Sequence, residues 1–215
     1  MHDSSFELIL FDLGGVVVEL TGVQTMIEWS GGDITPEEVW RRWLRCGAVR
    51  DFESGKTSVE HFTAQAVEEL GLSVSPERFL EGFRSWIGGT YDEIHDIIAE
   101  LRGHTPVGCL SNTNQIHWET MTGKFGLDAL FDHHFLSHHI GLTKPDREIF
   151  EHIISATSIR PGRILFLDDN LPNVEGARSA GLHSYHVRGA SEAGKVLEEL
   201  GLLGPGTTAE NRRTA

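Results

Sequence analysis

The stretch that constrains this chain most is an apolar run near its N-terminus that ends on a single carboxylate. It reads Phe6-Glu7-Leu8-Ile9-Leu10-Phe11 and is followed by Asp12, Leu13, Gly14 and Gly15. Apolar runs of this length without alternation are typical of buried parallel strands. Ligands bind at the carboxyl ends of such strands, and glycines let the backbone approach a ligand closely. Asp12 is therefore the first candidate for a reactive group, the alternative being an aspartate that only caps the next turn.

Composition and charge exclude several classes of function. The chain has 215 residues, 39% of them hydrophobic, which is enough for one well-packed domain and an insertion. Its formal net charge of -14 repels phosphate backbones and anionic lipid surfaces, so we expect neither nucleic acid nor a membrane as a partner. The same charge opposes small anionic substrates. A phosphate site would therefore need local cations, most simply a divalent metal and a lysine.

The cysteines and the N-terminus indicate the compartment. Cys46 and Cys109 show no metal-binding or redox spacing, so we expect free thiols in a reducing environment. The N-terminus lacks a basic segment, and Glu7 and Asp12 interrupt its apolar run, so neither a signal peptide nor a membrane span is predicted. We therefore expect a cytoplasmic protein.

The pattern is helical after Val18, and no convincing core strand is predicted before Val107. Three helix starts in this stretch show an N-cap residue followed by proline or acidic residues, at positions 35–38, 58–60 and 75–77. We expect these helices to form a small bundle. Trp40 and Trp43 have the spacing of its core-facing stripe, an assignment that we favour over a platform for substrate.

From Tyr91 on, helices and strands alternate, which is typical of a parallel sheet covered on both faces. The last dozen residues mix glycine, proline, threonine and charge, and a disordered tail is predicted there. The strands are expected at 107–110, 134–136, 163–167 and 184–187, and the helices at 92–102, 115–125, 147–156, 172–180 and 192–200.

Polar residues follow three of these segments, and they are the types that phosphoryl transfer needs. Ser111-Asn112-Thr113-Asn114 offers a hydroxyl and backbone amides at a helix start, a suitable place for phosphate oxygens. Lys144 precedes the next helix, and Asp168 and Asp169 form a pair that suits Mg²⁺, which prefers oxygen ligands. Each feature alone is common on protein surfaces. Their occurrence in one order at successive strand ends makes the set specific.

With these motifs the chain resembles the haloacid dehalogenase-like hydrolase superfamily over about residues 6–201. The resemblance implies an α/β fold, with a Rossmann-like doubly wound parallel sheet formed by residues 1–18 and 91–203. It also implies an inserted α-helical cap at residues 19–90, and residues 204–215 remain as the tail. The four motifs are Asp12-Leu13-Gly14-Gly15-Val16, Leu110-Ser111-Asn112, Lys144-Pro145-Asp146 and Leu167-Asp168-Asp169-Asn170.

The resemblance assigns roles in the transfer of a phosphoryl group. Asp12 would be the nucleophile that forms an aspartyl-phosphate, with Ser111 and Lys144 as the other catalytic residues. Ser111, Asn112 and Lys144 would bind the phosphoryl group of the substrate. Positioning and neutralisation of charge would then supply most of the rate.

The same resemblance implies Mg²⁺ as the cofactor. Its ligands would be Asp12, the carbonyl of Gly14, Asp168 and Asp169, and we favour Asp169 as the direct ligand with Asp168 as its neighbour. The metal would neutralise charge on the oxygens of the phosphoryl group.

Gly14 departs from the family pattern, in which phosphatases usually carry a second aspartate two residues after the nucleophile. A glycine cannot protonate a leaving alcohol or activate water, so the usual general acid is missing. The chain here resembles the subgroup that includes bacterial α-glucose-1-phosphate phosphatase, whose anomeric oxygen leaves more readily than an ordinary alcohol. We therefore expect the rate to depend steeply on the leaving group.

The predicted function is a Mg²⁺-dependent phosphatase for a small phosphorylated metabolite, with a sugar phosphate as one candidate. Two alternatives stay open: a 2-haloacid dehalogenase, which uses the same aspartate without a metal, and a catalytically weak homologue that binds phosphate or regulates. The expected partner is a small-molecule phosphate ester, and the expected assembly is a monomer or a homodimer. The Asp168–Asp169 pair favours the phosphatase over the dehalogenase.

Overall fold

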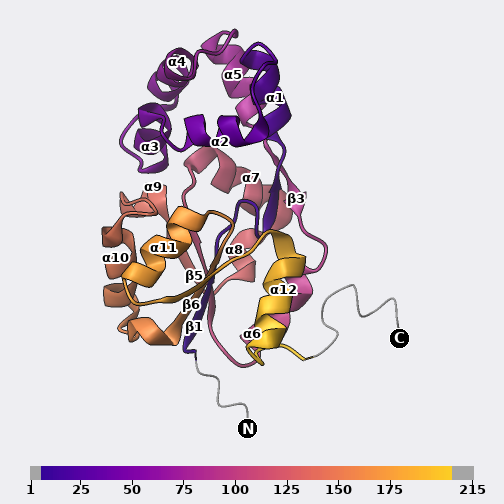
Figure 1. Ribbon diagram of the computed structural model, residues 1–215, viewed down its shortest axis with the longest axis vertical. Helices are drawn as coiled ribbons and strands as arrows, with labels where there is room; N and C mark the ends of the chain where they lie inside the picture. Colours follow the sequence, from indigo (N-terminus) through magenta and orange to yellow (C-terminus); the bar gives the residue numbers. More distant parts are fainter. Residues whose placement is uncertain (1–5, 205–215) are drawn as a thin grey trace.

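Five parallel strands form the main sheet of the computed structural model, which describes residues 6–204 (Figure 1). Their order is β5-β4-β1-β6-β7, so the first strand of the chain lies in the centre. Ile9 pairs with Val107 on one side and with Leu165 on the other. The parallel α/β sheet predicted from the sequence is thus confirmed. The strands are β1 (Leu8–Phe11), β4 (Val107–Ser111), β5 (His133–Leu136), β6 (Ile164–Asp168) and β7 (His183–His186).

Helices cover both faces of this sheet, which explains the unbroken apolar run of β1. Leu8 and Leu10 pack on one face in a cluster with residues of α10 and α11, and Ile9 and Phe11 pack on the other with residues of α6 and α12. None of these four side chains has exposed surface. The helices of this layer are α6 (Ile94–Arg102), α7 (Gln115–Phe125), α8 (Leu127–Leu130), α9 (Ser137–Ile140), α10 (Arg147–Thr157), α11 (Leu171–Ser179) and α12 (Gly189–Glu199), with a short 3₁₀ turn at Pro161–Arg163.

Five further helices lie together beyond the carboxyl ends of the strands (Figure 1). Three of them begin at the predicted N-caps, where Thr35, Ser58 and Ser75 accept hydrogen bonds from the backbone N–H three residues later. Aromatic rings fill a separate core between them, and Phe52 and Phe62 stack with their centroids 4.1 Å apart. We call these helices the cap helices: α1 (Gly22–Trp29), α2 (Pro36–Trp43), α3 (Gly47–Glu53), α4 (Val59–Leu70) and α5 (Pro76–Phe83).

A small antiparallel sheet joins the cap helices to the main layer. It consists of β2 (Val18–Leu20) and β3 (Ile87–Thr90), which are the two crossings between the layers. As expected, the main sheet takes no strand from residues 19–106, but this small two-stranded sheet was not predicted. The sequence Ile-Gly-Gly-Thr of β3 has two glycines and no alternation of apolar and polar residues, so it carries no local strand pattern.

Other expectations concern the thiols, the tail and membrane spans. Cys46 and Cys109 are buried free thiols. The predicted tail lies, from residue 205 on, outside the described residues. None of the helices between residues 6 and 204 combines the length and apolar character needed to cross a membrane.

Candidate active site

The carboxyl ends of the three central strands bring the predicted polar residues together. Asp12 directly follows β1, Ser111 ends β4 and Asp168 ends β6. Lys144, from the loop before α10, reaches between them: its Nζ lies 3.0 Å from Asp12 Oδ1 and 2.7 Å from Asp168 Oδ2. The same ammonium group donates a hydrogen bond of 2.9 Å to the carbonyl of Leu110. The structure therefore unites all four motifs at one edge of the sheet.

Asn112 fixes the loop that carries the lysine. Its Nδ2 donates to the carbonyl of Lys144 at 2.9 Å, and its Oδ1 accepts from the backbone N–H of Lys144 at 2.8 Å. Both ends of the amide therefore contact the backbone of Lys144. This pairing makes Asn112 a positioning residue for Lys144, whereas Ser111 is a buried residue that lines the same cavity as Asp12.

Asp168 and Asp169 are adjacent in sequence but differ in their surroundings. Asp168 is fully buried, and its oxygens accept hydrogen bonds from Lys144 Nζ, the backbone N–H of Asn170 at 2.7 Å and Asn173 Nδ2 at 3.1 Å. Asp169, by contrast, lines the cavity. Asp168 is thus suited to hold Lys144, and Asp169 is the member of the pair whose carboxylate faces the open volume.

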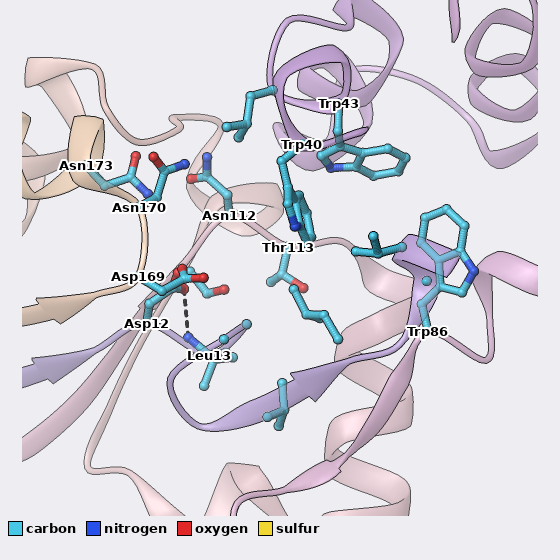
Figure 2. Close-up of a pocket in the computed structure, with 18 of the residues that line it drawn as sticks. Asp12, Leu13, Trp40, Trp43, Trp86, Asn112, Thr113, Asp169, Asn170 and Asn173 are labelled. Carbon is cyan, nitrogen blue, oxygen red and sulfur yellow. Dashed lines mark hydrogen bonds between the residues drawn. The ribbon is translucent and has the colours of Figure 1, made fainter. Parts of the chain in front are cut away.

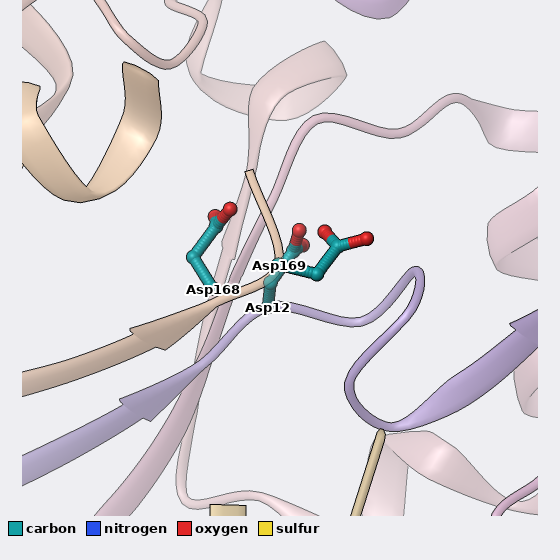
Figure 3. Close-up of side chains that lie close together, drawn as sticks. All are labelled: Asp12, Asp168 and Asp169. Carbon is teal, nitrogen blue, oxygen red and sulfur yellow. The ribbon is translucent and has the colours of Figure 1, made fainter. Parts of the chain in front are cut away.

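The three aspartates could hold a metal ion. One oxygen from each of Asp12, Asp168 and Asp169 lies within 4.8 Å of the others, and Figure 3 shows their carboxyl groups side by side. All the donors are carboxylate oxygens, which hard divalent cations prefer. The residues therefore fit Mg²⁺ in the chemistry of their donors.

The charges at the site are unbalanced, because three carboxyl groups share one ammonium group. Burial raises the pKa of Asp12, the nearby Asp168 and Asp169 add to this rise, and Lys144 opposes it. Burial and the charge of Asp168 raise the pKa of Asp169 to about 6. Burial acts to lower the pKa of Lys144, but the charges of Asp12 and Asp168 outweigh it and raise the pKa. A bound divalent cation would neutralise the excess negative charge.

Gly15 allows the turn after β1 to approach this cluster. Its φ is +74°, a left-handed conformation that favours glycine, and an added Cβ would lie 2.2 Å from Asp169 Oδ2. The backbone N–H of Leu13 donates a hydrogen bond of 2.7 Å to Asp12 Oδ1. The turn thus orients Asp12 and leaves room for Asp169.

A cavity of about 920 Å³ extends from these residues to the cap helices (Figure 2). His117 lies on its wall, where its Nε2 is 2.8 Å from the carbonyl of Phe83 and its ring packs on the Phe83 ring at 4.1 Å. Burial lowers the pKa of His117 to about 4, so the ring is neutral at pH 7. These contacts give His117 a packing role at the wall of the cavity.

Glu53 and Trp40 are among the cavity residues that were not assigned to the site from the sequence. Glu53, the last residue of α3, lines the cavity but belongs to no motif. Trp40 also lines it and is 38% exposed, so its assignment to the core of the bundle was wrong. Trp43 is buried against Phe83 and Trp86. Residues three apart on a helix lie on neighbouring parts of its surface, about 60° apart in direction, and here Trp43 joins the aromatic core of the cap while Trp40 lies outside it.

Comparison with known proteins places this site in a family. The family model for haloacid dehalogenase-like hydrolases matches residues 6–181. A D-ribitol-5-phosphate phosphatase of Bacteroides thetaiotaomicron is 28% identical over 198 residues, which cover 86% of this chain and 93% of the relative. A sesquiterpene phosphatase of Aspergillus oryzae is 25% identical over 197 residues, with coverage of 86% and 91%.

A solved structure of this family has a similar fold. A HAD-family enzyme of Bacteroides thetaiotaomicron, in complex with magnesium and inorganic phosphate, has a TM-score of 0.69 and 24% identity, and the match covers 85% of this chain and 94% of that chain. The match of the family model shows that the chain belongs to the haloacid dehalogenase-like hydrolases, and the shared fold agrees with this assignment.

Proposed function

We propose that the protein is a Mg²⁺-dependent phosphatase that hydrolyses small phosphorylated metabolites through an aspartyl-phosphate on Asp12. The observation that carries this proposal is the contact of 3.0 Å between buried Asp12 and Lys144, beside two more carboxylates at the base of a large cavity. The relatives support it, since they include phosphatases for a polyol phosphate and a sesquiterpene.

Each residue has a defined part in the proposed reaction. A carboxylate oxygen of Asp12 attacks phosphorus, and the aspartyl-phosphate is then hydrolysed by water. Ser111 and Lys144 hold the phosphoryl oxygens, with Asn112 and Asp168 fixing the position of the lysine. Stabilisation by such fixed charges is the largest contribution in many enzymes.

The metal would be held by Asp12, Asp169 and the carbonyl of Gly14, with Asp168 as a neighbouring carboxylate. When bound, Mg²⁺ supplies electrostatic stabilisation of the phosphoryl oxygens. The solved HAD-family enzyme that contains magnesium and inorganic phosphate supports this cofactor. The acidic cluster also favours a phosphatase over a 2-haloacid dehalogenase, since dehalogenation needs no cation.

We further propose that residues 19–90 act as the cap and that residues 1–18 and 91–203 act as the hydrolase core. The cap helices and the sheet have separate hydrophobic cores, and the cavity lies between them. Residues for chemistry then come from the core, and contacts with the organic part of the substrate come largely from the cap.

A screen of phosphate monoesters with Mg²⁺ or with excess chelator tests the function. We expect release of inorganic phosphate in Mg²⁺ and a loss of at least about 10²-fold in chelator, the scale of losing one preorganised electrostatic contact. Rates that are unchanged in chelator would contradict the metal dependence. Release of halide from a 2-haloacid, with no ester hydrolysed, would identify the dehalogenase instead.

A further inference from the structure

The cavity has two chemically different ends. At one end, Figure 2 shows Asp12 and Asp169 below a group of three asparagines, Asn112, Asn170 and Asn173. At the other end it shows the indole rings of Trp40, Trp43 and Trp86. A substrate whose phosphate reaches Asp12 therefore places its organic part among these aromatic side chains.

The apolar end continues beyond the tryptophans. Val23 and Met26 of α1 line it, as do Leu20 of β2 and Ile87 of β3. Indole, thioether and branched alkyl groups offer large contact areas but few hydrogen-bond partners. A polyol placed here would lose bonds to water at about 1–3 kcal/mol for each group left unpaired.

The exposed apolar side chains of the protein also lie at this cavity. Among residues 6–204, the large hydrophobic side chains that are exposed are Trp40, Leu44 and Leu171, at 38%, 56% and 48%. All three line this cavity, and they come from both layers: Trp40 and Leu44 from the region of α2, and Leu171 from the start of α11. Exposed apolar patches of this kind mark binding sites, because a ligand can remove them from water.

We infer that the preferred substrates are phosphate monoesters with a bulky hydrocarbon body, rather than sugar or polyol phosphates. This inference rests on the proposed function, because it names the substrate class of the same site. The phosphate binds at Asp12 and Lys144, and the hydrocarbon lies between the tryptophans and the leucines at the mouth. This class differs from the sugar phosphate that the sequence offered as one candidate.

A series of linear alkyl phosphates tests the inference, because chain length changes while the leaving alcohol keeps nearly the same acidity. From ethyl to octyl phosphate, kcat/KM should rise about threefold to fourfold for each CH₂ group that is buried. Octyl phosphate should exceed glucose 6-phosphate and ribitol 5-phosphate by about 10²-fold. Higher kcat/KM for the sugar and polyol phosphates would overturn the inference and leave the phosphatase function intact.

Binding of alkylphosphonates, which this reaction does not cleave, separates the two proposals. Calorimetry should show that Kd falls from ethylphosphonate to octylphosphonate. If Kd falls in this way but no ester is hydrolysed, the proposed function fails and the apolar site stands.

Trp40→Ala should weaken the binding of octylphosphonate about tenfold or more, since the exposed indole can be removed without opening the core. The control is Glu81→Ala on exposed α5, outside the cavity. A Kd independent of chain length would overturn the inference.

A second, independent observation concerns the general acid that Gly14 cannot supply. Glu53 lies half-buried on the cavity wall, at the end of α3. Contacts on both sides of it fix this segment to the core: Arg50 forms an ion pair with Asp146, and Gly55 lies against the carbonyl of His138. Glu53 is thus a carboxyl group from the cap that is held at the same cavity as Asp12.

The surroundings of Glu53 suit a group that gains and loses a proton. Burial raises its pKa to about 7, although the charge of Lys144 and a hydrogen bond with Trp43 act to lower it. Other charged groups near α3 are already engaged or neutral. On α4, Glu69 accepts from the backbone N–H of Gly47. On α9, burial and His139 lower the pKa of His138 to about 4.

We propose that Glu53 supplies the proton for the leaving group. As the bond between Asp12 Oδ and phosphorus forms, the ester P–O bond breaks and the departing oxygen takes the proton of Glu53. The carboxylate of Glu53 then takes a proton from the attacking water, the bond between phosphorus and Asp12 breaks, and inorganic phosphate leaves. Both carboxyl groups are restored. The absence of an acid at Gly14 led us to expect a rate that depends steeply on the leaving group. With Glu53 as the proton donor, this steep dependence would appear only in variants that lack the Glu53 carboxyl group.

Glu53→Gln tests this role across aryl phosphates of graded leaving-group pKa. General acids contribute about 10²- to 10⁴-fold, so we expect losses on that scale for poor leaving groups and small losses for good ones. The native kcat/KM should fall above about pH 7, where Glu53 loses its proton, and this limb should vanish in the variant. Glu81→Gln, on the exposed surface of α5, is the control and should keep the native profile.

Adding Gly14→Asp to Glu53→Gln provides a rescue. Gly14 lacks a left-handed φ, and its Cβ would meet only the flexible end of Leu20 at 3.0 Å, so an aspartate can be placed there. The double variant should regain a shallow dependence on leaving-group pKa. If Glu53→Gln alone keeps the native slope and pH profile, Glu53 is not the proton donor.

Discussion

Replacing Asp12 with asparagine should abolish the release of phosphate and leave the fold intact. An amide is a poor nucleophile, so no aspartyl-phosphate can form, and loss of a nucleophile costs on the order of 10⁴-fold or more in kcat. The fold should survive because burial and two neighbouring carboxylates already disfavour the charged form of Asp12. Removing that charge relieves repulsion with Asp168 and Asp169, so the melting temperature should stay the same or rise.

Steady-state kinetics and calorimetry on Asp12→Asn measure both effects. Asp92→Asn, in the loop before α6, is the control for an aspartate on the surface and should keep native rates. Rapid quench of the native enzyme with substrate should also yield a phosphorylated peptide that contains Asp12. Activity that survives in Asp12→Asn, or a phosphorylated residue elsewhere, would refute the mechanism.

The strands and helices of the main sheet layer could be predicted from the sequence because the patterns that indicate them are local. The run of β1 is apolar throughout since Leu8 and Leu10 pack on one face of the sheet and Ile9 and Phe11 on the other. The family assignment and the α/β fold are confirmed. By contrast, β3 contains Gly88 and Gly89 and pairs only with β2, far away in sequence, so no local pattern revealed it.

The cavity is the part of the candidate site that could not be predicted from the sequence. Trp40 and Trp43 share a short helix, and only the packing of that helix against the other cap helices decides which of them joins the aromatic core of the cap. Glu53 belongs to no motif, and its place at the cavity depends on how α3 of the cap is held against the core. The different surroundings of Asp168 and Asp169 likewise depend on Lys144, which comes from another segment of the chain.

Lys144→Met should reduce both activity and stability, for separable reasons. The variant loses the fixed positive charge beside Asp12, which we expect to lower kcat by about 10²-fold or more. It also leaves Asp168, a fully buried carboxylate, without its ammonium partner. Removing one member of a buried ion pair typically costs about 3–5 kcal/mol in the free energy of unfolding.

A double variant, Lys144→Met with Asp168→Asn, distinguishes the two effects. Asparagine at position 168 removes the uncompensated charge, so most of the free energy of unfolding lost in Lys144→Met should return when it is measured by urea denaturation. The rate of phosphate release should stay low, because the phosphoryl group still lacks the lysine. Since Nζ of Lys144 contacts both carboxylates, the lysine stabilises the fold through Asp168 and serves the reaction beside Asp12. Native kinetics in Lys144→Met would show that the charge of Lys144 plays no part in phosphoryl transfer, whatever its contribution to stability.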